Sequence, residues 1–286
     1  AYCEQRRRFS GRADNFMIAV FSRGMVRRIP GLAVLLGAEI RFRPRRPLSA
    51  LRAVAGWGTK PTAAQARAFA ARHGLPFLAV EDGFLRSVEP GGSGAPPLSV
   101  VVDDLGIYYD ADRASRLVAL IAAPLTDEQA TRARELVRRW RDGRLSKYNH
   151  AREWAAPFAE PYVLVVDQTR GDASIRHGQA DESSFARMLQ AALAEHPDKQ
   201  IVLKVHPDVV AGRKHGHFAN LRDRLPARVT LLAEDAHPPG LIERSAAVYV
   251  VTSQMGFEAL LWGKPVRSFG MPFYAGWGLT TDELVA

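Results

Sequence analysis

The chain has little cysteine and no long apolar run, and both absences narrow its class. Cys3 is the single cysteine among 286 residues, so the sequence can form no internal disulfide framework and no cysteine-based metal cluster. No apolar segment approaches the roughly 20 residues that span a bilayer, and no signal-peptide pattern is visible. We therefore expect a cytoplasmic protein.

Several well-known catalytic motifs are also missing. The sequence contains no P-loop, no G-x-G-x-x-G opening a helix, no H-E-x-x-H and no G-x-S-x-G. These absences argue against P-loop ATPases, dinucleotide dehydrogenases, zincins and serine hydrolases. The acidic pairs Asp103-Asp104 and Asp110/Asp112 match no EF-hand spacing, and no His or Cys lies nearby to complete a transition-metal site. We predict no metal and no cofactor.

Positive charge is in excess, with 39 Lys and Arg against 30 Asp and Glu, a net charge of +9. Part of it lies in short arginine runs such as Arg6-Arg7-Arg8 and Arg138-Arg139. A basic surface suits nucleic acid, an anionic membrane or an acidic substrate, and an arginine-rich solvated surface is the plain alternative. Aromatic residues do not interleave these runs as they do in single-strand binders. We expect an anionic lipid or an acidic sugar rather than nucleic acid.

Short apolar strands alternate with helical segments along the chain, which indicates an α/β fold with parallel sheets. In the first half we predict strands at residues 17–22, 53–56 and 77–80 and helices at 26–36 and 62–73. The less regular middle predicts strands at 98–102 and 107–109 and helices at 113–122 and 126–141. In the second half we predict strands at 162–166, 201–205, 229–232 and 248–251 and a helix at 184–195.

The length allows two domains of roughly 140 residues each. Residues 1–15 are polar and Arg-rich, which is typical of a tail or linker. We place an N-terminal domain over 16–155 and a C-terminal domain over 156–286. Two Rossmann-like domains facing a cleft form an arrangement similar to that of GT-B glycosyltransferases. Ligands of such sheets bind beyond the carboxyl ends of the strands.

The most informative segment covers residues 248–266. An apolar strand ends in a turn with Ser253 and Gln254, passes Gly256 and enters a helix. Free backbone N–H groups and the positive end of the helix dipole make such a turn an anion site. We predict Glu258 in the first helical turn, where its carboxylate accepts hydrogen bonds from ribose hydroxyls. A nucleotide-linked donor is expected to bind here.

Lys204-Val205-His206-Pro207 closes the predicted strand 201–205. Pro207 restricts the residue before it, so His206 is held extended at the strand tip. Its ring can donate to a phosphate, and Lys204 contributes a cation on the alternating side. The alternative is a histidine that is merely hydrogen-bonded at a strand end.

Carboxylates follow two further strands. The loop 167–174 carries Gln168 and Asp172, and the alternative there is an aspartate that caps the next helix. Residues 81–87 follow the strand 77–80, and the alternative there is a plain turn. Carboxylates at two strand ends can supply an acid/base and a nucleophile. The candidates in residues 81–87 are Glu81, Asp82, Arg86 and Ser87.

Taken in order, these motifs resemble the bacterial capsule-polysaccharide β-Kdo transferases, where Kdo is 3-deoxy-D-manno-oct-2-ulosonic acid. The resemblance covers about residues 16–282, and it is specific because many separated motifs agree in order. The segments that carry it include residues 81–87, 102–104, 106–110, 146–149, 165–169, 204–208, 250–254, 256–261 and 263–266.

The resemblance implies a cytoplasmic, membrane-associated GT-B enzyme that takes Kdo from CMP-Kdo. It implies transfer with retention, by double displacement, onto a Kdo-extended phosphatidylglycerol-type lipid. By motif position the nucleophile falls on Asp172 and the acid/base on Glu81, with Asp82 as the competing residue. The CMP-binding positions are Lys204, His206, Pro207, Ser253, Gln254, Gly256 and Glu258. The substrate-binding positions are Arg86, Ser87 and Gln168.

Family members often carry two such modules in tandem. The chain begins Ala1-Tyr2-Cys3 without Met, and we expect it to be one module that ends before its C-terminal helices. Two alternatives stay open, which are a GT-B transferase for another CMP-sugar and a non-catalytic module that binds donor or lipid.

Overall fold

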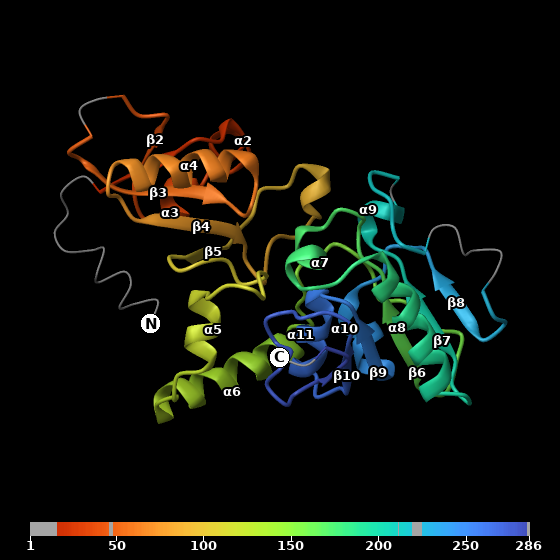
Figure 1. The fold of residues 1–286 in the computed structure, drawn as a ribbon. Helices are drawn as coiled ribbons and strands as arrows, with labels where there is room; N and C mark the ends of the chain where they lie inside the picture. The colour runs from red at the N-terminus through yellow and green to blue at the C-terminus, as the bar shows by residue number, and fades with distance from the viewer. Residues whose placement is uncertain (1–15, 46–47, 211, 219–224, 285–286) are drawn as a thin grey trace. The chain divides into compact units, whose positions relative to one another are not determined.

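The computed structural model in Figure 1 describes residues 16–45, 48–210, 212–218 and 225–284. The chain forms two compact units, each built around its own sheet. The first unit contains the described residues up to Arg86, together with Pro96–Tyr108 and Arg113–Pro124. The second unit contains Ser87–Ala95, Tyr109–Asp112 and the described residues from Leu125 onward.

The sheet of the first unit has the strand order β2-β1-β3-β4-β5. All its strand pairs are parallel except the pair of β4 and β5. The strands are β1 (Met17–Val20), β2 (Glu39–Phe42), β3 (Leu51–Trp57), β4 (Phe77–Asp82) and β5 (Val100–Asp103). The helices are α2 (Arg23–Arg28), α3 (Leu32–Leu36), α4 (Pro61–Arg72) and α5 (Arg116–Ile121).

The sheet of the second unit has the order β11-β10-β9-β6-β7-β8, and every pair in it is parallel. Its strands are β6 (Tyr162–Val166), β7 (Ile201–Lys204), β8 (Val229–Leu232), β9 (Ser245–Val250), β10 (Val266–Ser268) and β11 (Thr281–Asp282). Its helices are α6 (Asp127–Asp142), α7 (Ala173–His177), α8 (Glu182–Glu195), α9 (Pro207–Val210), α10 (Pro238–Arg244) and α11 (Gln254–Leu261), with a 3₁₀ turn, η1 (Gly91–Ser93).

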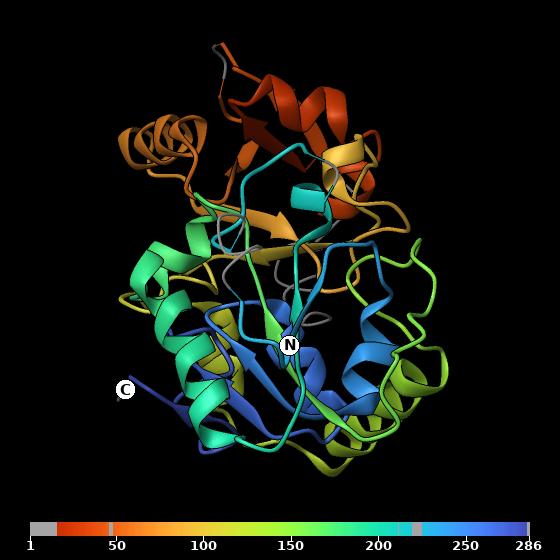
Figure 2. The ribbon, with the colours of Figure 1, turned by 90° about the vertical axis from the view of Figure 1, so that its right-hand side faces the viewer.

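The central strand β6 is buried on both faces. Val163 and Val165 pack with α8 in one core cluster, whereas Leu164 and Val166 pack with α10 and α11 in another. Figure 2 shows α8 on one side of this sheet and α10 on the other. A strand covered by helices on both faces is apolar at nearly every position, and this is why β6 could be predicted from its sequence.

The predicted α/β class and the two Rossmann-like sheets are confirmed. The helix predicted over 26–36 is divided into α2 and α3 around Pro30, because proline disfavours a helical conformation of the residue before it. Residues 107–109, predicted as a strand, form a turn instead. Helices α7 and α9 were not predicted, because four or five residues are too few to show a helical periodicity.

The division of the chain differs from the predicted boundary near residue 155. Residues from Leu125 onward belong to the second unit, as do two earlier segments. Within that unit, Arg141 on α6 donates to the carbonyl oxygen of Leu261, and Ser146 donates to Glu258 over 2.8 Å. These contacts join positions more than 100 residues apart, so no local pattern marks them. The predicted tail, residues 1–15, lies outside the described residues.

Within the described parts of the chain, no helix combines the length and the apolar character needed to cross a membrane.

The buried position of Leu164 gives a test of this packing. We expect Leu164→Ala to lower the free energy of unfolding by about 2–5 kcal/mol, because it leaves a cavity between β6 and the α10–α11 layer. Leu279, which is 67% exposed, is the matched control. Leu279→Ala should change stability by less than about 0.5 kcal/mol. Chemical unfolding of the two variants measures the difference, and equal effects would contradict the assignment of the core.

Candidate active site

The polar motifs of the second unit lie at the carboxyl ends of three neighbouring strands. Gln168 follows β6, His206 follows β7, and Ser253 follows β9. Because β9, β6 and β7 are adjacent and parallel, these residues share one edge of the sheet. This is the edge at which doubly wound sheets bind their ligands. The structure therefore brings together the motifs that the sequence places far apart.

Ser253 is the N-cap of α11, and its hydroxyl accepts a hydrogen bond from the backbone N–H of Met255 over 3.3 Å. Gly256 has a packing role in this turn. A Cβ atom at this position would lie 2.3 Å from the hydroxyl oxygen of Tyr274. That hydroxyl donates to the carbonyl oxygen of Ser253 over 2.5 Å. Glycine is therefore required so that Tyr274 can hold the start of α11.

The sequence predicts Glu258 in the first turn of the helix, but it lies in the second turn of α11. It is 1% exposed. Its carboxylate accepts hydrogen bonds from the Ser146 hydroxyl (2.8 Å), the Lys147 backbone N–H (3.2 Å) and the Gln254 amide (3.1 Å). Burial raises the pKa of Glu258 to about 7. These bonds replace the expected ribose contact, and they fasten the segment 146–147 to α11.

Lys204 is the last residue of β7, and its side chain is buried. It alternates with Leu203, so it shares the sheet face of Val202 and the α10–α11 layer. Among the described residues its ammonium has no hydrogen-bond partner. Burial lowers the pKa of Lys204 to about 8, although the charge of Asp235 opposes this shift. A buried ammonium without an acceptor is unfavourable, and this points to an anionic ligand.

His206 stands directly beyond β7. Burial lowers the pKa of His206 to about 4, so the ring is neutral at physiological pH. Its Nδ1 atom accepts a hydrogen bond from the backbone N–H of Asp208 over 3.0 Å. This bond places the ring proton on Nε2, which is then a donor. Pro207 begins α9 directly after His206.

Asp172 is exposed and is the N-cap of α7. Its Oδ1 atom accepts from the backbone N–H of Ser174 over 2.9 Å and from the Ser174 hydroxyl over 2.9 Å. The helix-capping alternative therefore describes its local contacts. Capping occupies only Oδ1, and no described residue donates to Oδ2. A capping role and a chemical role are compatible at this position.

Gln168 is buried, and the structure ties it to β9 instead of exposing it to a substrate. Its Oε1 atom accepts from the backbone N–H of Thr252 over 2.8 Å, and its Nε2 donates to the Thr252 hydroxyl over 3.0 Å. The preceding residue, Asp167, is 2% exposed. Burial raises the pKa of Asp167 to about 6. Both side chains thus belong to the interior of the second unit.

The predicted acids of the first unit lie at the end of β4. Asp82 forms an ion pair of 2.9 Å with the buried Arg86. Glu81 is half-buried, and its Oε1 accepts from the backbone N–H of Asp82 over 3.1 Å. Ser87 belongs to the second unit, where its buried hydroxyl donates to the carbonyl oxygen of Glu89 over 2.6 Å. Asp82 and Arg86 are thus engaged with each other.

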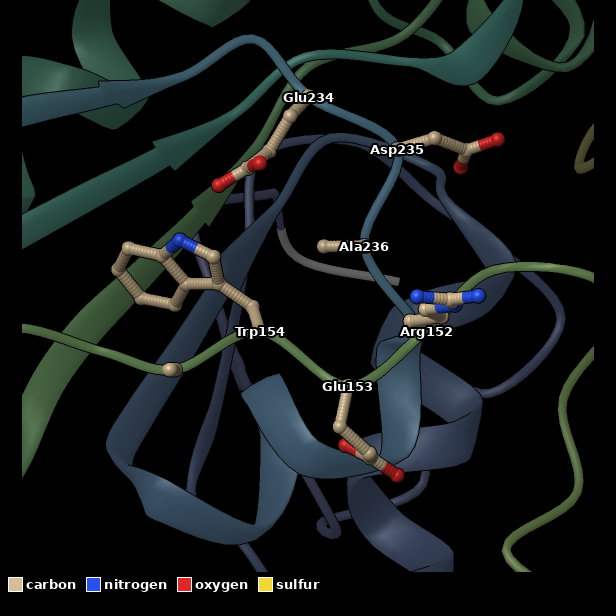
Figure 3. Close-up of a pocket in the computed structure, with 7 residues that line it drawn as sticks. Arg152, Glu153, Trp154, Glu234, Asp235 and Ala236 are labelled. Atoms are coloured by element: carbon tan, nitrogen blue, oxygen red, sulfur yellow. The ribbon is translucent and has the colours of Figure 1, made fainter.

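The second unit also contains a cavity of about 450 Å³ beside the loop that follows β8. Figure 3 shows the Trp154 ring on one side of it and Arg152 and Asp235 on the other. Asp235 forms an ion pair with His150, and its charge acts on Lys204. Three carboxylates make the lining mainly acidic. The lining residues are Arg152, Glu153, Trp154, Ala155, Glu234, Asp235 and Ala236.

Sequence reasoning gave no individual role to several residues of this edge. Lys147 was seen only as part of the segment 146–149, and Thr252 only as part of a turn. Ser174 and Asp235 were not singled out. Asp235 follows β8, so its position after a predicted strand was an available signal. Among the described residues, no three or more His, Cys, Asp or Glu side chains are grouped to hold a metal ion.

The sheets and their covering helices are Rossmann-like α/β domains, the architecture of GT-B-like glycosyltransferases. The chain belongs to the capsule polysaccharide biosynthesis protein family, whose model matches residues 52–140 and 124–286. The predicted resemblance is thereby confirmed at the level of the family.

Two curated relatives are longer than the chain. It is 49% identical over 270 residues to the capsule polysaccharide modification protein LipA of Neisseria meningitidis serogroup A, covering 92% of this chain and 38% of LipA. It is 38% identical over 234 residues to the lipopolysaccharide-processing protein LpsZ of Rhizobium meliloti, covering 79% of this chain and 52% of LpsZ. The chain therefore spans about two fifths to one half of these relatives.

Two solved structures are similar over nearly the whole chain, and both come from KpsC of Thermosulfurimonas dismutans. The β-Kdo 2,4-transferase is 44% identical with a TM-score of 0.87, covering 95% of this chain and 85% of that one. The β-Kdo 2,7-transferase is 26% identical with a TM-score of 0.61, covering 95% and 84%.

The environment of Lys204 predicts a pH dependence of stability. Its pKa is 10.5 when unperturbed and about 8 in the fold, so between these values the folded protein binds fewer protons than the unfolded chain. The free energy of unfolding should therefore rise with pH in this window, by up to about 3 kcal/mol from this group.

Lys204→Met keeps the stem of the side chain and removes its charge. Unfolding of wild type and Lys204→Met at pH 7 and pH 10 measures the effect. The rise with pH should be larger for wild type, and parallel pH profiles would show that Lys204 is not desolvated.

Proposed function

We propose that this chain is a retaining glycosyltransferase module that moves Kdo from CMP-Kdo to a Kdo-bearing lipid acceptor in capsule polysaccharide synthesis. Membership of the capsule polysaccharide family supports the pathway, and the similarity to a β-Kdo 2,4-transferase over 95% of the chain supports the reaction. The buried ammonium of Lys204, beside the neutral His206, is the observation that carries the proposal, because it is a preformed anion site.

The donor supplies two anionic groups, the phosphate of CMP and the carboxylate of Kdo. In the proposal the phosphate lies between Lys204, the Nε2–H of His206 and the N-terminus of α11 at Ser253. Lys147 is held next to α11 by Glu258, and its charge acts on His206. These donors stabilise the charge that develops on the phosphate when CMP departs.

The cavity beside Asp235 favours cytidine as the nucleoside. The carboxylates that line the cavity accept hydrogen bonds and donate none when they are ionised. Cytosine carries an exocyclic amine that can donate to them, whereas uracil presents a carbonyl oxygen at the same ring position. Asp235, which lines the cavity, also acts electrostatically on Lys204, a group of the proposed phosphate site. The nucleotide would thus be held at its phosphate by cations and at its base by acids.

In the chemical step, Oδ2 of Asp172 attacks the anomeric carbon of Kdo, and the bond from that carbon to the phosphate oxygen breaks with its electron pair leaving on CMP. The product is a glycosyl ester. The acceptor hydroxyl then attacks the same carbon and passes its proton to a general base, while the ester oxygen returns to carboxylate. Two inversions give retention. We assign the base to Glu81 by the position of its motif, with Asp82 as the competing residue.

The net charge of +9 suits an acidic donor and an anionic lipid acceptor at the cytoplasmic face of the inner membrane. The relatives exceed the chain in length, so we propose that it works beside a second transferase module. No metal or cofactor is assigned to the reaction.

Asp172→Asn tests the nucleophile. Asparagine still caps α7 but cannot form the ester, so transfer should fall by about 10⁴-fold or more while CMP affinity changes less than about threefold. Asp181→Asn is the matched control, because Asp181 caps α8 in the same way and should stay active. Product formation and calorimetric CMP titration measure the two properties. Wild-type turnover in Asp172→Asn would reject the assignment.

A donor comparison separates the proposal from its alternatives. Without acceptor, wild type mixed with CMP-Kdo should gain one Kdo residue on Asp172, seen by intact-mass and peptide mass spectrometry. CMP-sialic acid should give no adduct, whereas the reverse preference would indicate another CMP-sugar transferase. CMP binding with no adduct and no product from any acceptor would indicate a non-catalytic module.

A further inference from the structure

A row of side-chain hydrogen bonds in the second unit ends on Asp172. The hydroxyl oxygen of Ser174 lies 2.9 Å from Asp172 Oδ1 and 3.0 Å from the hydroxyl oxygen of Thr252. The Thr252 hydroxyl oxygen in turn lies 3.0 Å from Gln168 Nε2. The row therefore runs from the end of β6, across the end of β9, to the start of α7. We call it the Gln168–Thr252–Ser174 relay.

The hydrogen-bond donors of the relay can all be directed toward Asp172. Gln168 Oε1 accepts from the backbone N–H of Thr252 over 2.8 Å, which fixes the amide so that Nε2 is the group facing the Thr252 hydroxyl. A carboxylate only accepts hydrogen bonds, so the Ser174 hydroxyl donates to Asp172. The Thr252 hydroxyl has two acceptors within reach, Ser174 Oγ at 3.0 Å and Gln168 Oε1 at 3.3 Å. When it donates to the nearer one, Ser174, it still accepts from Gln168 Nε2. In that arrangement both hydroxyl protons are directed toward the carboxylate.

The packing around Thr252 fixes the position of its hydroxyl oxygen. Cβ atoms added at Gly178 and Gly270 would lie 2.6 Å and 2.9 Å from the Thr252 methyl carbon. The methyl group therefore fills a space that two glycines leave open, and the hydroxyl on the same Cβ is turned toward Ser174. Gln168 and Thr252 are both buried. The buried Gln168 and Thr252 are thus linked through the half-buried Ser174 to the exposed Asp172.

We propose that the Gln168–Thr252–Ser174 relay positions Asp172, holding Oδ1 so that Oδ2 is presented to the anomeric carbon. This inference rests on the proposed role of Asp172. When Oδ2 forms the ester, Oδ1 becomes its carbonyl oxygen and keeps the two donors of Ser174. In the second step the bond from the sugar to Oδ2 breaks and the electron pair returns to the carboxylate. The same donors then stabilise the charge that returns.

The cap of the next helix shows what is specific to Asp172. Asp181 also precedes a helix and also accepts from the serine two positions on, over 2.8 Å from the Ser183 N–H and 2.5 Å from its hydroxyl. The Ser183 hydroxyl accepts from Arg187 at the surface over 2.6 Å, not from an interior side chain. Both caps share the Asp-x-Ser sequence, but the serine hydroxyl of the Asp172 cap contacts the buried Thr252, whereas that of the Asp181 cap contacts the surface Arg187.

Ser174→Ala and Thr252→Val break the relay at two points, and Ser183→Ala removes the equivalent hydroxyl from the control cap. We expect the first two to lower kcat by about 100-fold and to slow formation of the Kdo adduct, with CMP affinity unchanged, because a misplaced nucleophile affects the chemical step. Ser183→Ala should retain wild-type kcat. Thr252→Ser keeps the hydroxyl and should recover most of the activity that Thr252→Val loses.

Asp172→Asn, measured in the same assay, separates the two ideas. If Asp172→Asn is inactive while Ser174→Ala and Thr252→Val match Ser183→Ala, the relay is rejected and the nucleophile stands. If Asp172→Asn turns over normally, the nucleophile itself is rejected and the relay with it. Thermal unfolding of each variant controls for loss of the fold. Ser174→Ala alone decides the outcome if Thr252→Val proves unstable, because position 174 is only half-buried.

Discussion

The hydrogen bonds between Gln168 and Thr252 join the ends of β6 and β9, and the candidate site depends on them. Beyond these ends the chain leaves the sheet toward α7 in one case and toward α11 in the other. Fixing one end against the other sets the position of Asp172 relative to Ser253. Asp172 and Ser253, which we propose as the nucleophile and as part of the phosphate site, therefore follow strand ends that interior side chains hold together.

Three ionisable groups at this edge, the buried Glu258 and Lys204 and the half-buried His206, are accommodated in different ways. Glu258 is buried with three donors around its carboxylate, so its environment is complete within the protein. His206 is neutral, because burial lowers its pKa to about 4. The ammonium of Lys204 has no hydrogen-bond acceptor among the described residues, so its burial is not compensated within them. This difference is why Lys204, rather than Glu258, indicates that an anion belongs at the site.

The local sequence around Asp172 could not have distinguished it from Asp181. Both are aspartates two positions before a serine, and both cap a helix. The capping alternative rested on this local pattern, whereas the catalytic expectation came from the position of the motif within the resemblance. The structure adds the contact from Ser174 to Thr252, a residue 78 positions further along the chain. That contact comes from strand pairing, which no window of sequence contains.

The sequence by itself determined the α/β class, most strands and the order of the motifs, because buried parallel strands are apolar throughout and their ends carry polar residues. The tertiary structure decided which of those polar residues turn inward. Glu258 and Gln168 became interior anchors, and residues 125–155 joined the second unit. The reason is physical: burial and hydrogen-bond partners depend on which elements pack together, and the partners here are 84 to 112 residues apart in the chain.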